Sequence, residues 1–312
     1  MSKSSGPILL AYDGSETSAT AIAVAGRLLP RRQALVCHVW SGLTHDLMFG
    51  LLARLPDAVG DAAAELDAED MREADKLAAD GVRLAREAGF EAQPLLARNE
   101  RPTWHVLSEA ADCQEASVIV VGAHGLSGVR RAVLGSVSTA LVHHAHAPVL
   151  VVPPPSPSEE SDGPLLLCYD GSDNAKRAIA IAGRLFAPRS GLVLHFSDSW
   201  VAEAPALAGL GRAVEGMAVE LDEIADEQSS HIADDGVELA EQSGFEATPV
   251  SERATAPGWI MVRDIADEHA CAAIVVGTRG LTGISAALGN VSNGVVHNSR
   301  RPVLVVPPDN HQ

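Results

Sequence analysis

Aromatic and basic residues are scarce in this sequence of 312 residues. Phe, Trp and Tyr together make up 4% of it, and there are 23 Lys and Arg against 41 Asp and Glu. A core with so few rings must consist mostly of Ala, Val, Leu and Ile. The net charge of -18 repels phosphate backbones and anionic lipid, so we expect no nucleic acid and no membrane as a partner. It still permits one small anion in a local site built from backbone amides.

Cysteine is also scarce, and long apolar runs are missing. The four cysteines are Cys37, Cys113, Cys168 and Cys271, and no two of them form a C-x-x-C pair. The apolar run before Asp13 is too short for a signal peptide, and no stretch of about 20 apolar residues could span a bilayer. These absences predict reduced, mostly buried thiols in a soluble cytoplasmic protein.

Several sequence signatures of enzymes are missing as well. The chain has no G-x-x-x-x-G-K-[S/T] phosphate loop, no G-x-S-x-G nucleophile turn, and neither an H-E-x-x-H nor an E-x-x-H metal helix. His143, His144 and His146 resemble metal ligands, but only His143 and His146 would share one face of a helix. We therefore expect no metal centre there and at most weak ATPase activity.

The chain contains the same domain twice. The segment LLAYDGS at 9–15 returns as LLCYDGS at 166–172, and PVLVVPP at 148–154 returns unchanged at 302–308. The offset is 157 residues for the first pair and 154 for the second, which indicates a duplicated domain rather than a short structural repeat. A stretch rich in Pro, Ser and acidic residues joins the halves and is typical of an exposed linker. We expect a first domain at 1–153, a linker at 154–163 and a second domain at 164–312.

Each half alternates apolar, β-rich runs with helical segments. This alternation predicts an α/β fold with a parallel sheet and helices on both faces. Ser15 and Pro102 are suited to begin helices, and Gly89 is suited to end one. The expected strands of the first half are 7–12, 34–40, 90–97, 117–122 and 148–152, and the expected helices follow Ser15 and cover 61–89, 102–113 and 136–146.

A glycine-rich segment follows the fourth expected strand. Gly122 and Gly125 are followed after nine residues by Gly135 and Ser136. Glycine lets the backbone turn tightly and approach a ligand, and a helix that begins at Ser136 would offer free amides and a favourable dipole to a phosphate. Ser136 and Ser138 would add hydroxyl donors. Asp13 follows the first strand, where its carboxylate can accept hydrogen bonds from ribose hydroxyls.

This pattern resembles the universal stress protein family. The resemblance rests on G-x2-G-x9-G-[S/T] after a strand, an early Asp-Gly-Ser and a terminal P-V-L-V-V, and it covers both halves. It implies two Rossmann-like domains (adenine nucleotide α-hydrolase-like), each with strand order 3-2-1-4-5, and an ATP site between the first and fourth strands. By this resemblance Asp13 and Val39 would hold the nucleoside. The phosphates, with a divalent ion such as Mg²⁺, would be held by Gly122, Gly125, Gly135, Ser136 and Val137.

The family also implies how the two halves associate. The identical PVLVVPP segments would be edge strands that pair, so that the halves form an intramolecular pseudo-dimer. A homodimer of the whole chain is a further expectation, which no segment of the sequence specifies.

The second half departs from the glycine pattern. Gly277 and Gly280 are followed by only eight residues before Gly289, and the next residue is Asn290 in place of a hydroxyl residue. Asp170 is the counterpart of Asp13, and Arg279 stands where the first half has His124, so both positions can supply a basic contact. Arg130 and Arg131 lie between the glycines of the first half only. We hypothesise a weakened or altered second site.

Three functions from different classes compete. The first is an ATP-binding stress regulator whose nucleotide alters conformation or partner contacts. The second is a tandem interaction module whose loop binds nothing. The third is an enzyme of the wider adenine nucleotide α-hydrolase superfamily, whose S-G-G-x-D-S and H-I-G-H signatures this chain lacks. The intact glycine pattern of the first half favours nucleotide binding.

Overall fold

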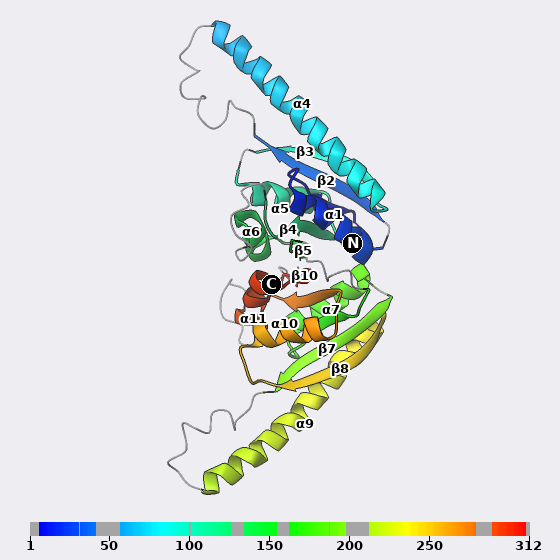
Figure 1. Cartoon of the computed structure of the whole chain (residues 1–312), viewed down its shortest axis with the longest axis vertical. Helices are drawn as coiled ribbons and strands as arrows, with labels where there is room; N and C mark the ends of the chain where they lie inside the picture. Colours follow the sequence, from blue (N-terminus) through cyan, green and yellow to red (C-terminus); the bar gives the residue numbers. More distant parts are fainter. Residues whose placement is uncertain are drawn as a thin grey trace. The chain divides into compact units, whose positions relative to one another are not determined.

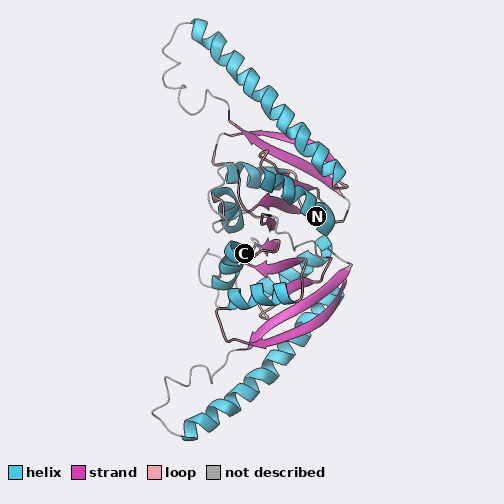
Figure 2. Cartoon of the chain, in the orientation of Figure 1, coloured by secondary structure: helices cyan, strands magenta, loops and turns pink. Residues whose placement is uncertain are grey.

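The computed structural model describes nine stretches of the chain. They are residues 6–30, 32–41, 57–99, 101–125, 134–154, 162–186, 188–197, 212–278 and 289–309. The chain divides into two compact units, Met1–Pro155 and Ser156–Gln312, and each is described by itself. Figures 1 and 2 show that each unit consists of a sheet with helices on both faces.

The sheet of the first unit has five strands, all parallel, in the order β3-β2-β1-β4-β5. The predicted fold class and strand order 3-2-1-4-5 are therefore confirmed. The strands are β1 (Ile8–Ala11), β2 (Gln33–Trp40), β3 (Glu91–Arg98), β4 (Val118–Gly122) and β5 (Val149–Val152). Every residue of β1, β4 and β5 is buried, as expected for strands covered on both faces.

The helices of the first unit are α1 (Glu16–Leu28), α4 (Asp57–Glu87), α5 (Thr103–Cys113) and α6 (Ser136–His144). The first two pack against each other, as do the last two, and the pairs cover opposite faces of the sheet (Figure 1). Three predicted helix boundaries were wrong by two residues or more. The long helix runs from Asp57 to Glu87 rather than over 61–89. The last helix ends at His144 rather than at 146, because the chain after it is extended, with Ala145 at φ -68° and ψ 143°.

The second unit repeats this architecture with the strand order β8-β7-β6-β9-β10, all parallel. Its strands are β6 (Leu165–Cys168), β7 (Arg189–Ser197), β8 (Phe245–Arg253), β9 (Ala273–Gly277) and β10 (Val303–Val306). Its helices are α7 (Asp173–Phe186), α9 (Arg212–Gln242), α10 (Gly258–Glu268) and α11 (Asn290–Asn298).

The turn after β1 shows how local sequence begins a helix. Gly14 has a φ of +83°, which an L side chain rarely adopts, so glycine is required there. The next residue, Ser15, is the N-cap of α1, and its hydroxyl oxygen accepts a 3.1 Å hydrogen bond from the amide of Ser18. The predicted cap is thus confirmed, and the turn leaves Asp13 at the carboxyl end of β1.

A glycine inside each long helix admits a tyrosine ring. A Cβ at Gly81 of α4 would lie 2.7 Å from Cδ1 of Tyr12, and a Cβ at Gly236 of α9 would lie 2.6 Å from the same atom of Tyr169. Each long helix therefore packs directly on the tyrosine that follows the first strand of its unit. This tyrosine immediately precedes Asp13 in the first unit and Asp170 in the second. Burial raises the pKa of both tyrosine hydroxyls.

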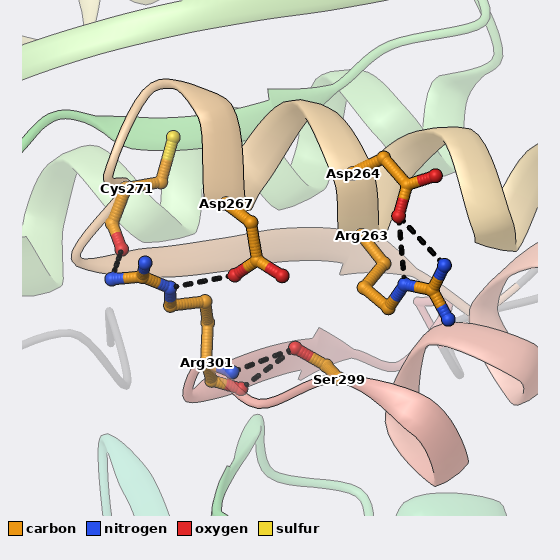
Figure 3. Close-up of polar contacts among 6 residues, drawn as sticks. All are labelled: Arg263, Asp264, Asp267, Cys271, Ser299 and Arg301. Carbon is orange, nitrogen blue, oxygen red and sulfur yellow. Dashed lines mark hydrogen bonds and ion pairs between the residues drawn. The ribbon is translucent and has the colours of Figure 1, made fainter. Parts of the chain in front are cut away.

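The second unit has a buried arginine that joins α10 to the chain before β10. Arg301 is 8% exposed; its Nε donates to Oδ1 of Asp267 at 3.2 Å and its Nη1 to the carbonyl oxygen of Cys271 at 3.0 Å (Figure 3). The first unit has Ala147 at the equivalent position and instead pairs His146 Nδ1 with Asp112 Oδ2 at 2.8 Å. The equivalent helices α5 and α10 are thus held by different polar contacts, a histidine–aspartate pair in the first unit and a buried arginine in the second.

Candidate functional site

The first unit contains a cavity of about 370 Å³ at the carboxyl ends of β1, β2 and β4, beside the beginnings of α5 and α6. This is where open parallel sheets bind ligands. All nine residues predicted for the first-half site line it: Asp13, Val39, Gly122, His124, Gly125, Gly135, Ser136, Val137 and Ser138. Segments more than 100 residues apart in sequence therefore meet around one space.

Asp13 is oriented by the turn that follows it. Its Oδ1 accepts a 3.0 Å hydrogen bond from the amide of Ser15. A Cβ at Gly125 would lie only 2.7 Å from its Oδ2. Glycine at 125 is thus what allows the loop after β4 to approach this carboxylate, and a side chain there would compete with it for the same space.

The N-terminus of α6 opens into the cavity. Gly135 is its N-cap and supplies no side-chain cap, while Ser136 and Val137 of the first turn line the cavity. The first amides of an α-helix lack partners within the helix, and the helix dipole favours an anion beside them. The amide of Gly135 donates at 2.7 Å to the carbonyl oxygen of Ala123, which holds the helix start against the end of β4.

Ser138 ties the first turn of α6 to β4. Its hydroxyl is buried and donates its single proton to the carbonyl oxygen of Gly122 at 2.7 Å. This bond gives Ser138 a positioning role in the structure, and the predicted donor to phosphate at this position stays a prediction.

His124 brings a ring nitrogen to the same loop. Its Nε2 is buried and has no hydrogen-bond partner among the residues that the structure describes. A buried polar atom of this kind calls for a partner, and the cavity that the residue lines is where a ligand could provide one. The predicted basic contact at this position remains a prediction.

Sequence reasoning missed several residues that line the first cavity. They include Tyr12, Ser18, Cys37, Thr103 and Leu107. Cys37 lies two residues before Val39 on β2, so strand alternation alone would have placed both on one face. Burial raises the pKa of the Cys37 thiol to about 12, which makes it an apolar wall rather than a nucleophile.

The second unit has a corresponding cavity of about 320 Å³. Four predicted residues line it, namely Asp170, Gly277, Gly289 and Asn290, whereas Arg279 and Gly280 lie outside the described residues. The supporting bonds recur: the amide of Ser172 donates to Asp170 Oδ1 at 3.0 Å, and Ser292 donates to the carbonyl oxygen of Gly277 at 2.6 Å. The framework is therefore conserved between the units, while parts of the lining differ.

Two histidines that line the cavities, His38 and His195, form hydrogen bonds with the backbone. His38 Nδ1 donates to the carbonyl oxygen of Tyr12 at 2.9 Å, and His195 does the same to Tyr169. Both side chains are buried, so they brace the ends of neighbouring strands. Within the described stretches, no group of three or more His, Cys, Asp or Glu residues is arranged to hold a metal ion. None of the described helices has the length and apolarity needed to cross a membrane.

Comparisons with known proteins agree with this architecture. Universal stress protein Rv2005c of Mycobacterium tuberculosis is 31% identical over 251 residues, which cover 74% of this chain and 75% of that protein. The crystal structure of a universal stress protein from Archaeoglobus fulgidus has a TM-score of 0.61 at 20% identity and covers 99% of this chain and 98% of its own, a likeness of fold. Another structure from that organism is a complex with dAMP; it covers 46% of this chain and 97% of its own at 21% identity, with a TM-score of 0.33.

The model of the universal stress protein family matches the chain twice, at residues 5–153 and 163–307. Since the two matches together span nearly the whole sequence, the chain belongs to the universal stress protein family as a tandem of two such domains.

Proposed function

We propose that the cavity of the first unit binds ATP together with Mg²⁺, and that the bound nucleotide alters the conformation or the partner contacts of the protein in a stress response. The observation that carries the proposal is the convergence of nine predicted residues on one cavity at the carboxyl edge of a parallel sheet. Its volume of about 370 Å³ lies within the range of small-molecule sites.

The two ends of the cavity suit the two ends of a nucleotide. Asp13 and Val39 would hold the nucleoside, with the carboxylate accepting hydrogen bonds from the ribose. The first turn of α6 would hold the phosphates, because its amides and dipole favour negative charge. His124 would donate a hydrogen bond from its ring Nε2 to the same anion.

A magnesium ion would depend on the phosphates for most of its ligands. Asp13 is the one carboxylate among the described residues that line the first cavity. Mg²⁺ is usually bound by one or two carboxylates, several waters and substrate phosphates, so a site of this kind fits the ion only when a nucleotide is present. Binding of Mg-ATP does not require catalysis, and we propose at most slow hydrolysis.

Calorimetric titration with Mg-ATP tests the proposal on wild type, Gly125→Glu and Gly280→Glu. We expect wild type to bind, and Gly125→Glu to abolish binding because its side chain would meet Asp13 Oδ2 and repel both that carboxylate and phosphate. Gly280→Glu should leave the binding at the first unit intact. Thermal unfolding of each variant serves as the control for folding.

A tandem interaction module is the second candidate, since the second unit departs from the glycine pattern. It becomes the better account if wild type gives no heat with Mg-ATP and carries no nucleotide after purification. Light scattering with and without Mg-ATP then shows whether a second copy of the chain is among the partners.

A further inference from the structure

The second cavity has an aromatic wall where the first has an aliphatic one. The amide of Tyr12 donates to Cys37 O at 3.0 Å, and that of Tyr169 donates to Leu194 O at 2.9 Å, so Cys37 and Leu194 are equivalent. Two residues further along each strand, Phe196 therefore stands in the place of Val39. It is half-buried and lines the cavity.

Strand alternation places the ring of Phe196 on the cavity side of β7. A Cβ at Gly236 of α9 would lie 2.7 Å from Cγ1 of Val193, so Val193 faces α9. Successive side chains of a strand point to opposite faces, which puts Leu194 and Phe196 on the face of α10, where the cavity lies. About 320 Å³ remains open beside them, so these larger side chains line the cavity without filling it.

The opposite end of the second cavity is less suited to a chain of phosphates. Asn290 begins α11 where Ser136 begins α6. The eight residues between Gly280 and Gly289 include no charged side chain, whereas the corresponding nine of the first half include Arg130 and Arg131. Arg279 is the single basic residue of the second glycine segment, in a chain whose net charge is -18. A polyphosphate would therefore gain less here than in the first unit.

The carboxylate that could bind a sugar is present in both cavities. Asp170 lines the second cavity, and the amide of Ser172 holds its Oδ1 at 3.0 Å, as Ser15 holds Asp13. A carboxylate of fixed orientation beside a half-buried aromatic ring that lines the same cavity is a combination that suits a nucleoside, because the ring can stack on the base while the carboxylate accepts from the sugar hydroxyls.

We propose that the second cavity binds a nucleoside by stacking its base on Phe196 and hydrogen-bonding its sugar to Asp170, and that phosphates add little to its affinity. The orientation assumed here rests on the function proposed for the first cavity, in which Asp13 and Val39 hold the nucleoside. The two units would then sense different forms of one class of ligand, the triphosphate in the first and the nucleoside in the second.

Photolabelling of the wild-type chain tests this without any variant. The probe is 8-azidoadenosine, and mass spectrometry identifies the labelled peptides. We expect label on the peptide that contains Phe196, protected by an excess of unlabelled adenosine. Label confined to the peptide of Val39, or no protected label, overturns the proposal. The readout is independent of ATP binding in the first unit, so it also distinguishes the failure of one proposal from that of the other.

Calorimetry on the full chain with Gly125→Glu measures the phosphate dependence. Adenosine, AMP and Mg-ATP should bind with affinities that agree within about threefold, and Phe196→Val should weaken adenosine by about tenfold, the lower range of base–aromatic stacking. Phe196→Tyr, which keeps the ring, should retain the affinity. An affinity for Mg-ATP more than about tenfold above that for adenosine, or an unchanged affinity in Phe196→Val, overturns the proposal.

Discussion

The hydroxyl of Ser138 donates a 2.7 Å hydrogen bond to the carbonyl oxygen of Gly122, sixteen residues earlier in the chain. The bond joins the first turn of α6 to the last residue of β4, and both residues line the first cavity. The second unit makes the same connection between Ser292 and Gly277 at 2.6 Å. In each unit one buried hydroxyl therefore sets the distance between the two elements that would surround a phosphate.

We expect Ser138→Ala to lower the free energy of unfolding by about 1 to 2 kcal/mol, because a buried carbonyl oxygen loses its donor. It should also weaken Mg-ATP binding several-fold, since the amides of α6 are no longer held in place. Urea unfolding and calorimetry measure the two effects. Ser292→Ala is the matched control: it removes the same bond from the second unit and should leave binding of Mg-ATP by the first unit unchanged. Equal losses of affinity in both variants would contradict the positioning role.

The hydrogen bond of Ser138 could not be predicted from the sequence, although the fold and nine of the residues that line the first cavity could. Apolar runs and the cap at Ser15 are local signals, and they predicted the strands and the helix that begins after Asp13. The acceptor of a hydroxyl proton depends on which carbonyl the fold brings near, and that is a property of tertiary structure. The long helix also extends through Gly60, a residue with poor helix propensity, so a start at 61 was a reasonable but wrong prediction.

The close packing at Gly81 could have been predicted from the sequence but was not. Asp-Gly occurs at equivalent positions of both long helices, where glycine is unfavourable by about 1 kcal/mol relative to alanine. Its recurrence indicated a close approach, and the structure shows Tyr12 at that place. Phe196 likewise follows from alternation on β7, once the ends of β2 and β7 are aligned.

Gly81→Ala should therefore destabilise the first unit, although the same change on an exposed helix surface would stabilise it. The added Cβ would lie 2.7 Å from Cδ1 of Tyr12 and 2.7 Å from Cγ1 of Val36, and such overpacking costs about 1 to 3 kcal/mol. Chemical denaturation measures the change. Gly81→Ala combined with Val36→Ala should regain part of the loss, and an increase in stability in the single variant would show that the helix can move away from the ring.

Two buried thiols and one half-buried thiol predict a loss of stability at high pH. Burial raises the pKa of Cys37 and Cys168 to about 12 and that of Cys271 to about 11, against an ordinary value of 9.0. Between these values the unfolded chain releases protons that the folded chain keeps, so the stability from these groups is complete below pH 9 and is lost as the pH rises toward 11 to 12. Each thiol contributes a slope of about 1.4 kcal/mol per pH unit within its interval. Urea unfolding from pH 8 to 10.5 measures the decline.

Thiol reactivity gives an independent check. Cys113 is exposed, Cys37 and Cys271 are buried, and Cys168 is partly exposed where it lines the second cavity. A bulky aromatic disulfide reagent at pH 8 should react quickly with one thiol per chain, and Cys113→Ser should remove that fast phase. Two or more fast thiols in native wild type would show that the cavity walls open readily.

Arg301 and Arg263 each pair with a carboxylate of α10, but we expect the two ion pairs to differ in their contribution to stability (Figure 3). Arg263 is the closer of the two to its carboxylate, with Nη2 at 2.7 Å from Asp264 Oδ1, yet both side chains are substantially exposed to water. The side chain of Arg301 is 9% exposed and bonds both Asp267 and the carbonyl oxygen of Cys271. Burial and the second hydrogen bond, rather than the shorter distance, therefore decide which ion pair contributes more to stability.

We expect Arg301→Ala to lower the free energy of unfolding of the second unit by about 2 kcal/mol, less than for a fully buried pair because Asp267 keeps some contact with water. Arg263→Ala is the matched control and should cost less than about 1 kcal/mol. Arg301→Lys should recover only part of the loss, since one ammonium lacks the fork that reaches both acceptors. Urea unfolding of the three variants measures these differences, and equal costs for Arg301→Ala and Arg263→Ala would show that α10 is held by its apolar face alone.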